Sequence, residues 1–422
     1  MTAKAEISKS TTFTELERRY DLDWLRVITI FFVFIYHCTK FFDSDPFNVK
    51  NIPLDIQLSN KITANTVYLT AIGLPLFFII AGMSMFYALG YLEKKEIKIR
   101  QYALLRFIRL IVPYLIGMFT YVSLLVFLER TNQGLISVSF FVFYPTYYDG
   151  VYGFGGNFSV FGHHLWFLFV LFLFTSVILP LFVYLRKEKF RMGFSKIANF
   201  FTKPGTIFLL TIPILIMEIL HSLYLQDIPR LGGWDFFTYI FFLLFGYLFA
   251  YDRQFRTSFK KNFIIAIILG LLSTAALICL NIFYFDTIWL DPSFDSISII
   301  FHLARVIFSF SWIIVILNLA DKYLNKRSKV VKTMNEMVLP FYIIHFVVLS
   351  VVGFYIVQLD FLVISKFMLI FLISLVAIFL LLLLIREFNA LRFIFGMSIT
   401  KKKSISRFFK KKEISKEEKA SK

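Results

Sequence analysis

From Trp24 to Phe42 the sequence reads Trp-Leu-Arg-Val-Ile-Thr-Ile-Phe-Phe-Val-Phe-Ile-Tyr-His-Cys-Thr-Lys-Phe-Phe. This largely apolar run matches the roughly 20 residues that cross a bilayer, yet it contains Arg26 and His37. An ionisable residue inside a membrane helix is costly and usually functional. In a helix these two residues lie within about 20° of one face and roughly 16 Å apart along the axis. One face of this helix is therefore predicted to carry a cation near one membrane surface and a proton carrier nearer the other.

The composition of the whole chain indicates an all-α polytopic membrane protein. Hydrophobic residues make up 58% of the 422 residues, and 56 of the residues are Phe. Globular domains are only about 45–50% apolar. Runs close to the required length predict about ten transmembrane helices. They lie at about 24–42, 65–90, 103–128, 163–185, 206–225, 235–251, 262–285, 297–320, 337–357 and 362–385.

The distribution of Lys and Arg predicts the orientation of these helices. Cytoplasmic loops of membrane proteins are enriched in both residues. In this sequence, Lys and Arg are frequent in every second loop, from Lys94–Arg100 to Lys322–Lys332. The loops on the opposite side hold only Lys50, Lys61, Arg130 and Arg230. Both termini are therefore expected to be cytoplasmic, and the protein is expected in the cell (plasma) membrane as a multi-pass protein. The first helix is expected to be retained, because it has full spanning length and no small-residue cleavage site.

The polar ends of the chain complete the predicted domain organisation. We expect a disordered cytoplasmic leader (1–19), a ten-helix membrane domain (20–386) and a basic cytoplasmic tail (387–422), because the two ends are too polar to bury a core. The tail accounts for much of the formal net charge of +18. Directly after a membrane helix, such a tail is expected to meet anionic lipid headgroups, and no nucleic-acid partner is predicted. The sequence leaves the oligomeric state undetermined.

Three arginines are predicted to gather at the inner membrane boundary. Arg106 and Arg109 enter the third predicted helix from the cytoplasmic side and share a face, and Arg26 lies at a similar height. Two interpretations stay open. The side chains either extend to lipid headgroups, or they hold an anion such as phosphate with their guanidinium forks.

The histidines gather at the outer side instead. His163 and His164 open the fourth predicted helix just before Trp166, at about the height of His37. Further polar residues in or near the outer halves of predicted helices are Glu218, His221, His302, Arg305 and, closer to the middle, His345. Each histidine alone is explained by a hydrogen bond to a neighbouring helix. Together they predict a polar chamber.

The same residues argue against a metal site and a disulfide framework. The sequence has no His-x3-His pair, and Glu218 is the only carboxylate close to the histidines, so no metal is predicted. Cys38 and Cys279 both lie in predicted spans, which excludes a framework of disulfides. Cys38 is about 100° off the face of Arg26 and His37, so a buried thiol is favoured over an acyl-carrying nucleophile.

Several short patterns resemble the acyltransferase 3 family of integral membrane proteins, in particular its glucan biosynthesis protein C-like branch. Arg26-x10-His37 is similar to the family's first-helix pattern, and Arg106-x-x-Arg109 to its third-helix pattern. The segments His164-Leu165-Trp166-Phe167-Leu168 and Phe47-Asn48-Val49-Lys50-Asn51 resemble this branch's fourth-helix start and first outer loop. The resemblance extends from Arg19-Tyr20-Asp21-Leu22-Asp23 to Pro340-Phe341-Tyr342-Ile343-Ile344-His345.

One departure from the family pattern concerns the second helix. Where many members have Ser-Gly-Phe, this chain has Ala81-Gly82-Met83. A serine hydroxyl is therefore absent there, but Gly82 still permits a close backbone approach.

The resemblance implies an O-acyltransferase that moves an acyl group, acetyl or succinyl, from cytoplasmic acyl-coenzyme A to a hydroxyl of an extracytoplasmic carbohydrate. Arg26, Arg106 and Arg109 would hold the coenzyme A phosphates. His37 would be the general base, with His163 or His164 orienting the acceptor or stabilising the oxyanion. The remaining site residues expected to bind substrate are Trp166, Glu218, His221, His302, Arg305 and His345.

Other functions remain open at this stage. Direct transfer and a route through an acyl-His37 intermediate use the same residues. A polysaccharide or small-anion transporter or flippase would also use buried Arg and His, although no inverted repeat is visible. A purely structural scaffold would leave the buried charges unexplained.

Overall fold

Helices make up most of the chain in the computed structural model, which describes residues 19–44, 48–51, 55–153, 156–161, 163–225, 228, 230–290 and 295–399. Residues 1–18 of the predicted leader and the tail beyond Ile399 lie outside these residues. The first half contains α2 (Tyr20–Thr39), α3 (Ile56–Lys94), α4 (Ile99–Phe119), α5 (Tyr121–Asn132), α6 (Phe140–Thr146), α7 (Trp166–Leu185) and α8 (Glu188–Phe200). The second half contains η1 (Thr206–Leu210), α9 (Thr211–Tyr224), α10 (Thr238–Tyr251), α11 (Gln254–Lys261), α12 (Phe263–Phe283), η2 (Asp286–Leu290), α13 (Ser296–Tyr323), α14 (Lys329–Ile356), α15 (Val363–Glu387) and α16 (Asn389–Ile394).

The predicted all-α polytopic membrane protein is confirmed. Nine helices of the described chain are long and apolar enough to cross a membrane, with η1 and α9 together forming one of them. The tenth predicted span, 235–251, is α10, which has only 14 residues. Several helices exceed the predicted runs, most of all α3 with 39 residues.

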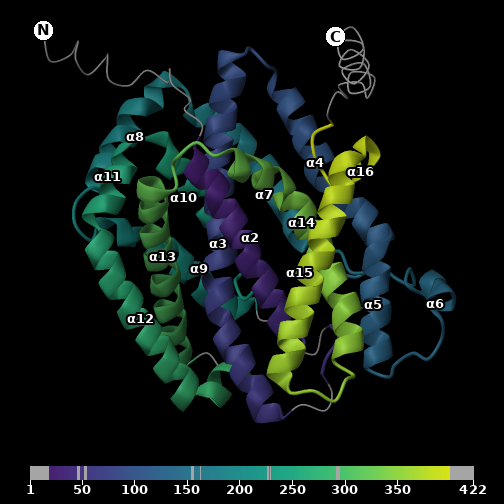
Figure 1. The fold of residues 1–422 in the computed structure, drawn as a ribbon. Helices are drawn as coiled ribbons and strands as arrows, with labels where there is room; N and C mark the ends of the chain where they lie inside the picture. Colours follow the sequence, from purple (N-terminus) through teal and green to yellow (C-terminus); the bar gives the residue numbers. More distant parts are fainter. Residues whose placement is uncertain are drawn as a thin grey trace, which may run out of the picture.

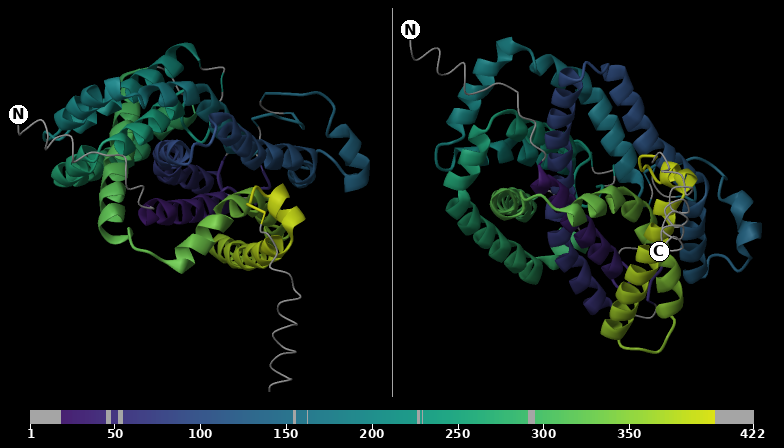
Figure 2. Two further views of the ribbon diagram at one scale, coloured as in Figure 1. Left: turned by 90° about the horizontal axis from the view of Figure 1, so that it is seen from above. Right: turned by 45° about the horizontal axis from the view of Figure 1, so that its top comes forward.

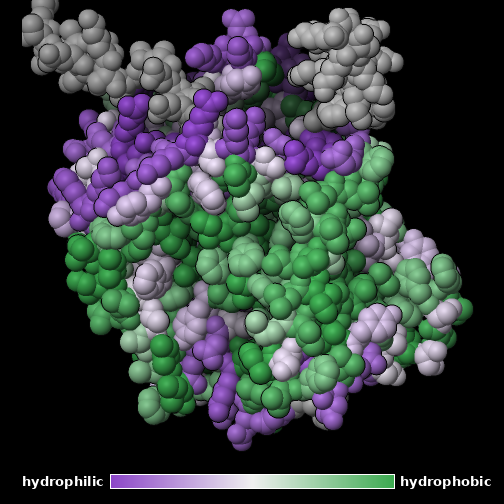
Figure 3. All heavy atoms as spheres, viewed as in Figure 1, coloured by the Kyte–Doolittle hydropathy of each residue, from purple (hydrophilic) through white to green (hydrophobic). Residues whose placement is uncertain are grey.

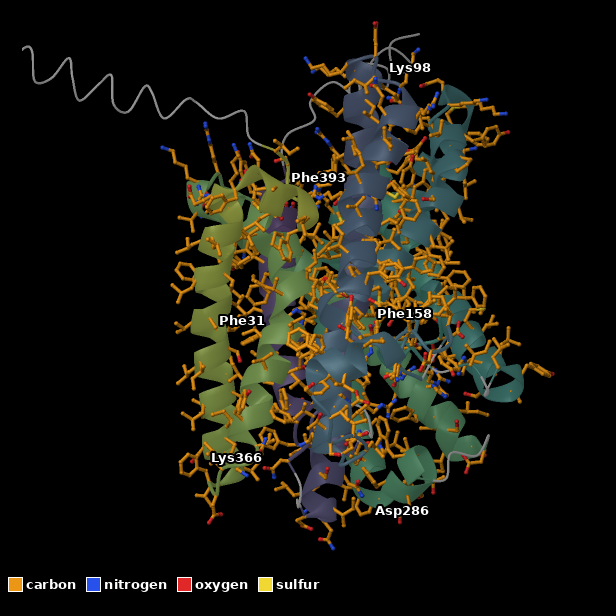
Figure 4. The ribbon with its side chains drawn as sticks, turned by 90° about the vertical axis from the view of Figure 1, so that its right-hand side faces the viewer. Phe31, Lys98, Phe158, Asp286, Lys366 and Phe393 are labelled. Atoms are coloured by element: carbon orange, nitrogen blue, oxygen red, sulfur yellow. The ribbon has the colours of Figure 1, made fainter. Side chains whose placement is uncertain are left out.

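The surface shows the distribution that a bilayer requires. On the face shown in Figure 3, hydrophobic side chains form a broad belt across the middle of the molecule, and hydrophilic side chains cover the end that carries α8 and α11 (Figures 1 and 3). Lys98 and Phe393 lie at this end, whereas Lys366 and Asp286 lie at the opposite end (Figure 4). The basic loops thus share one end of the bundle, which is the predicted cytoplasmic end.

Helices α2 and α3 occupy the middle of the bundle. They separate α12 and α13 on one side from α14 and α15 on the other, and the view from above shows the same arrangement (Figures 1 and 2). Helix α10 packs closely along α3 at two glycines. A Cβ atom added to Gly82 would lie 2.1 Å from the Leu243 carbonyl oxygen, and one added to Gly246 would lie 2.0 Å from that of Ile79. The expected backbone approach at Gly82 is therefore present, and small residues bring membrane helices together in this way.

We expect Gly82→Leu to destabilise the protein by about 1–3 kcal/mol or more, because backbone atoms of α10 occupy the space of the new side chain. The thermal unfolding midpoint of the detergent-purified protein measures this effect. Gly193→Leu in α8 is a matched control, since nothing lies within 4 Å of a Cβ at that position. Equal midpoints for the two variants would contradict the observed α3–α10 packing.

The third predicted span, 103–128, is wrong as a single helix. It is divided at Thr120, whose backbone angles are φ −125° and ψ −92°, so that α4 ends and α5 begins there. Helix ends leave carbonyl groups without intrahelical partners. The hydroxyls of Tyr144 and Tyr148 donate to the Phe119 carbonyl at 2.8 and 2.9 Å and satisfy it. The break lets α5 form one wall of the pocket described next.

Candidate active site

A pocket of about 310 Å³ lies near the predicted outer end of the bundle. It is enclosed by the last turns of α2, the middle of α3, the end of α5, the segment before α7, the loop before α10 and the middle of α14. The lining residues with polar side-chain atoms are Tyr36, His37, Lys40, Asn48, Thr70, Glu129, Arg130, Ser159, His163, His164, Trp166, Arg230 and Tyr342. Of the predicted site residues, His37, His163, His164 and Trp166 thus line one cavity.

Three imidazoles lie together at the base of this pocket. The ring centroid of His345 lies 5.0 Å from that of His37 and 5.4 Å from that of His164. Phe346 contacts two of the pocket histidines, with centroid distances of 4.7 Å to His37 and 5.2 Å to His164. His345 itself is fully buried and does not line the pocket. Helix α14 therefore packs against His37 and His164 through His345 and Phe346.

Hydrogen bonds define which ring nitrogens remain available. His164 Nε2 lies 2.9 Å from the Ile343 carbonyl oxygen, and His345 Nδ1 lies 2.6 Å from that of Tyr342. A carbonyl oxygen only accepts, so both nitrogens carry the proton, and the other nitrogen of each neutral ring holds a lone pair. Among the described residues no partner contacts His164 Nδ1, His345 Nε2 or His37 Nδ1. Buried ring nitrogens without a hydrogen-bond partner are unusual, and such groups suit proton transfer.

The outer rim of the pocket is held in a constrained backbone conformation. Asn48 and His163 have φ angles of 73° and 58°, which residues other than glycine rarely adopt. Glu129 Oε2 accepts a hydrogen bond from the Asn48 backbone N–H at 2.9 Å, which fixes the first outer loop to α5. Burial and the nearby Arg130 lower the pKa of His163, which precedes α7, to about 4. Its imidazole is therefore neutral at physiological pH.

The predicted arginine cluster lies on α2 and α4 toward the cytoplasmic end. Arg109 interacts electrostatically with both Arg26 and Arg106, so the three residues do come together. Arg26 pairs with Asp23 at 2.8 Å, while Arg106 donates to the Tyr102 hydroxyl at 3.1 Å. Across the described ranges no carboxylate lies within ion-pair distance of Arg106 or Arg109. The cluster therefore retains a net positive charge that fits an anion.

The remaining predicted residues form a second, separate network. Glu218 on α9 is fully buried and accepts from Arg305 on α13 at 2.5 Å and also from Arg230. His221 Nδ1 lies 2.8 Å from an Asp235 carboxylate oxygen. His302 on α13 joins the same network, because its Nε2 lies 3.0 Å from the Ser222 hydroxyl. The network positions the loop before α10, and its histidines are not part of the group around His37.

The four residues predicted to bind substrate in this region do not reach the pocket. Glu218, His221, His302 and Arg305 are absent from the lining of the pocket that the described residues form. Arg230 connects the network with the pocket, since it lines the cavity and pairs with Glu218. Their role in substrate binding stays a prediction, and the contacts indicate a role in holding Arg230.

Glu218→Ala is expected to destabilise the protein by about 3–5 kcal/mol, because it leaves buried Arg305 without its counter-charge. The measurement is the thermal midpoint of the purified protein. Glu188→Ala, an exposed carboxylate that pairs with Arg191 on α8, is the control and is expected to change the midpoint little. A stable Glu218→Ala variant that only loses substrate affinity would support the direct binding role instead.

Several residues of the pocket were not predicted as site residues from the sequence. Arg130 and Arg230 were only counted as outer-loop cations, yet both line it together with Lys40 and Tyr342. The Tyr342 hydroxyl donates to the His164 carbonyl and links α14 to the start of α7. One signal was present in the sequence: Arg230 is followed closely by Gly232 and Gly233, and adjacent glycines indicate a turn that can aim a side chain inward. Both glycines have a positive φ in the structure.

Comparison with known proteins agrees with the geometry. Residues 19–387 match the family model described as "Acyltransferase domain" (acyltransferase 3). Neither the curated proteins nor the solved structures give a match. The match covers every spanning helix from α2 to α15, together with the arginine cluster and the pocket. The chain therefore belongs to the acyltransferase 3 family and is a multi-pass membrane acyltransferase.

Proposed function

We propose that this acyltransferase takes an acyl group, acetyl or succinyl, from cytoplasmic acyl-coenzyme A and transfers it to a hydroxyl of an extracytoplasmic carbohydrate in the cell membrane. One observation carries the proposal: α2 presents Arg26 in a cationic cluster near one end and His37 in a polar pocket near the other. The two residues are roughly 16 Å apart along the helix. A donor with phosphates at one end and a thioester at the end of a long arm fits this separation.

The arginines are proposed to bind the donor. Guanidinium groups make bidentate, charge-assisted hydrogen bonds to phosphate oxygens. Arg106 and Arg109 have no carboxylate partner within the described part of the chain, so the coenzyme A phosphates would supply the missing counter-charge. Arg26 forms an ion pair with Asp23, so it contributes less positive charge to the site.

His37 is proposed to act as the general base. It removes the proton from the acceptor hydroxyl as that oxygen attacks the thioester carbonyl carbon. The new ester C–O bond forms, the C–S bond breaks, and the imidazolium returns its proton to the departing coenzyme A thiolate. An acyl-His37 intermediate would use the same side chain in two steps. His345 lies directly behind His37 and is proposed to fix the orientation of its ring.

His164 and the pocket cations are proposed to position the acceptor. The single proton of neutral His164 is donated to the Ile343 carbonyl, so the free Nδ1 can accept a hydrogen bond from the acceptor hydroxyl. The developing oxyanion needs a donor, and Arg130 or Arg230 in the same pocket can provide one. Trp166 presents an aromatic surface on which a sugar ring can pack.

The direct test uses membranes from cells that produce the chain. Radiolabelled acetyl-coenzyme A and succinyl-coenzyme A are supplied to these membranes, and alkali-labile label bound to carbohydrate is measured. We expect ester-linked label that depends on His37. Donor binding with no transfer to any acceptor would contradict the proposal.

A further inference from the structure

The first outer loop brings a short strap, residues 48–51, to the rim of the pocket, where Asn48 is one of the lining residues. Helix α5 holds this strap at two points. Glu129 Oε2 accepts a hydrogen bond from the Asn48 backbone N–H at 2.9 Å. At the end of the same helix, Asn132 Oδ1 accepts from the Lys50 N–H at 2.7 Å, and Asn132 Nδ2 donates to the Lys50 carbonyl at 3.1 Å.

Contacts to other elements fix the remaining residues of the strap. Val49 is 1% exposed, so its side chain belongs to the core. The Asn51 N–H donates to the carbonyl of Phe41, just after α2, at 2.9 Å. Buried Lys366 at the start of α15 donates to Asn51 Oδ1 at 2.6 Å. Lys366 lies at the end of the bundle opposite Lys98, so the strap is fixed at the predicted outer end (Figure 4).

The backbone of Asn48 has an unusual conformation. Its φ angle of 73° lies in the left-handed region, which residues with a Cβ atom rarely adopt. Glycine adopts this conformation without steric cost, so glycine would suit a position that served the backbone alone. Asparagine tolerates the conformation and adds a side-chain amide. The strap thus presents a polar group where the backbone itself favours none.

The side-chain amide of Asn48 is available to a ligand. It lines the same pocket as His37 and His164, and no residue in the described part of the chain forms a hydrogen bond with it. A carboxamide offers two N–H donors and one acceptor oxygen, which complement a hydroxyl group. At about 310 Å³ the pocket is at the small end of ligand sites, so one ligand can contact both the amide and the histidines.

We propose that Asn48 is a residue of the acceptor site. Its amide forms a hydrogen bond with a second hydroxyl of the acceptor, while His37 removes the proton from the hydroxyl that is acylated. The acceptor is thereby recognised as a polyol and not as an isolated alcohol. Because the strap is fixed on both sides, the amide is held in place before the acceptor binds, which favours binding. This inference rests on the proposed acyl transfer and adds a residue that binds the acceptor.

Two other roles for Asn48 fit the contacts less well. A role in the backbone alone explains the positive φ, but it leaves the amide in the pocket without a function. A contact with the coenzyme A phosphates would place Asn48 at the donor site. The arginine cluster around Arg109, however, lies on α2 and α4 toward the cytoplasmic end.

Asn48→Gly separates the side chain from the backbone, because glycine keeps the positive φ and lacks the amide. The detergent-purified protein receives radiolabelled acetyl- or succinyl-coenzyme A, with graded amounts of a carbohydrate extract from the producing cells as the acceptor. We expect the amount of extract that gives the half-maximal transfer rate to rise about three- to tenfold, the range for losing a neutral hydrogen bond. Donor affinity and the thermal midpoint are expected to stay nearly unchanged.

Two further variants control for the backbone. Glu96 has a φ of 54° and is exposed between α3 and α4, so Glu96→Gly makes the same kind of backbone change away from the pocket. It is expected to leave the half-saturating amount of extract unchanged. Asn48→Ala removes the amide but places a Cβ atom at a positive φ, so we expect the same rise together with a lower thermal midpoint. The half-saturating amount does not depend on the folded fraction, so partial unfolding does not obscure the comparison.

The outcomes separate this inference from the proposed function. Normal half-saturation in Asn48→Gly, with a defect only in Asn48→Ala, would assign Asn48 to the backbone and overturn the inference. Weaker donor affinity in Asn48→Gly, with an unchanged response to the extract, would assign Asn48 to the donor and overturn it as well. In both cases the wild-type protein still transfers label, so the proposed function stands. A wild-type protein that transfers no label to any amount of extract would overturn the proposed function and this inference with it.

Discussion

His37→Ala is expected to abolish acyl transfer while the protein remains in the membrane at its normal level. A general base contributes about 10²–10⁴ in rate, and His37 is the pocket histidine that shares a face of α2 with the donor site. Its ring lies 5.0 Å from that of His345, and its Nδ1 has no partner among the described side chains, so removing it breaks no recorded hydrogen bond. Turnover of labelled acyl-coenzyme A into ester measures the loss.

The control for this experiment is Cys38→Ser. Cys38 follows His37 but is fully buried, and it does not line the pocket. We expect this variant to retain activity, which would also exclude the thiol as an acyl carrier. Near-normal turnover in His37→Ala would show that His37 does not take part in the reaction. An inactive Cys38→Ser variant would instead assign the role of acyl carrier to the Cys38 thiol.

The Arg106→Ala, Arg109→Ala double variant is expected to bind the donor about 100-fold more weakly. Hydrogen bonds to charged groups contribute about 1.5–3 kcal/mol each, and about 1.4 kcal/mol corresponds to a tenfold change in affinity. Arg→Lys at both positions is also expected to weaken binding, because an ammonium group cannot reproduce the fork. Isothermal titration with a non-hydrolysable acyl-coenzyme A analogue measures the affinity.

Two comparisons make that titration specific. Arg100→Ala removes an exposed cation from the first turn of α4 and is expected to leave the affinity nearly unchanged. His164→Ala lies at the other end of the bundle and is expected to impair transfer without affecting donor binding. Unchanged affinity in the double variant would show that the two arginines only anchor α4 at the lipid surface.

The sequence was sufficient for the fold class because the physics of the bilayer acts on each helix separately. Apolar runs of about 20 residues define the spans, whatever their neighbours. The break at Thr120 could not be found in this way, because the Phe119 carbonyl beside it is satisfied by Tyr144 and Tyr148 from another segment. The predicted span 235–251 is longer than the 14 residues of α10, since Phe236 and Phe237 directly before the helix extend its apolar run.

The site was predictable only where one helix carries its parts. The spacing of Arg26 and His37 on α2, and of Arg106 and Arg109 on α4, follows from helical periodicity and needs no tertiary information. Grouping Glu218 and His302 with His37 depended on height in the membrane alone. Residues at equal height can belong to different networks, and Glu218 in fact pairs with Arg305 and Arg230. Which side chains converge depends on packing between distant helices.

We propose that the donor binds from the cytoplasmic face and the acceptor from the outer face, and membrane vesicles of opposite orientation test this arrangement. Radiolabelled acetyl- or succinyl-coenzyme A, which does not cross a bilayer, is added to the outside of sealed inverted or right-side-out membrane vesicles containing the protein. We expect His37-dependent ester label in inverted vesicles, and in right-side-out vesicles only after detergent opens them. Equal labelling of sealed right-side-out vesicles would contradict a cytoplasmic donor site. Intact labelled acyl-coenzyme A inside inverted vesicles would contradict it too, because the donor itself would then have crossed the bilayer.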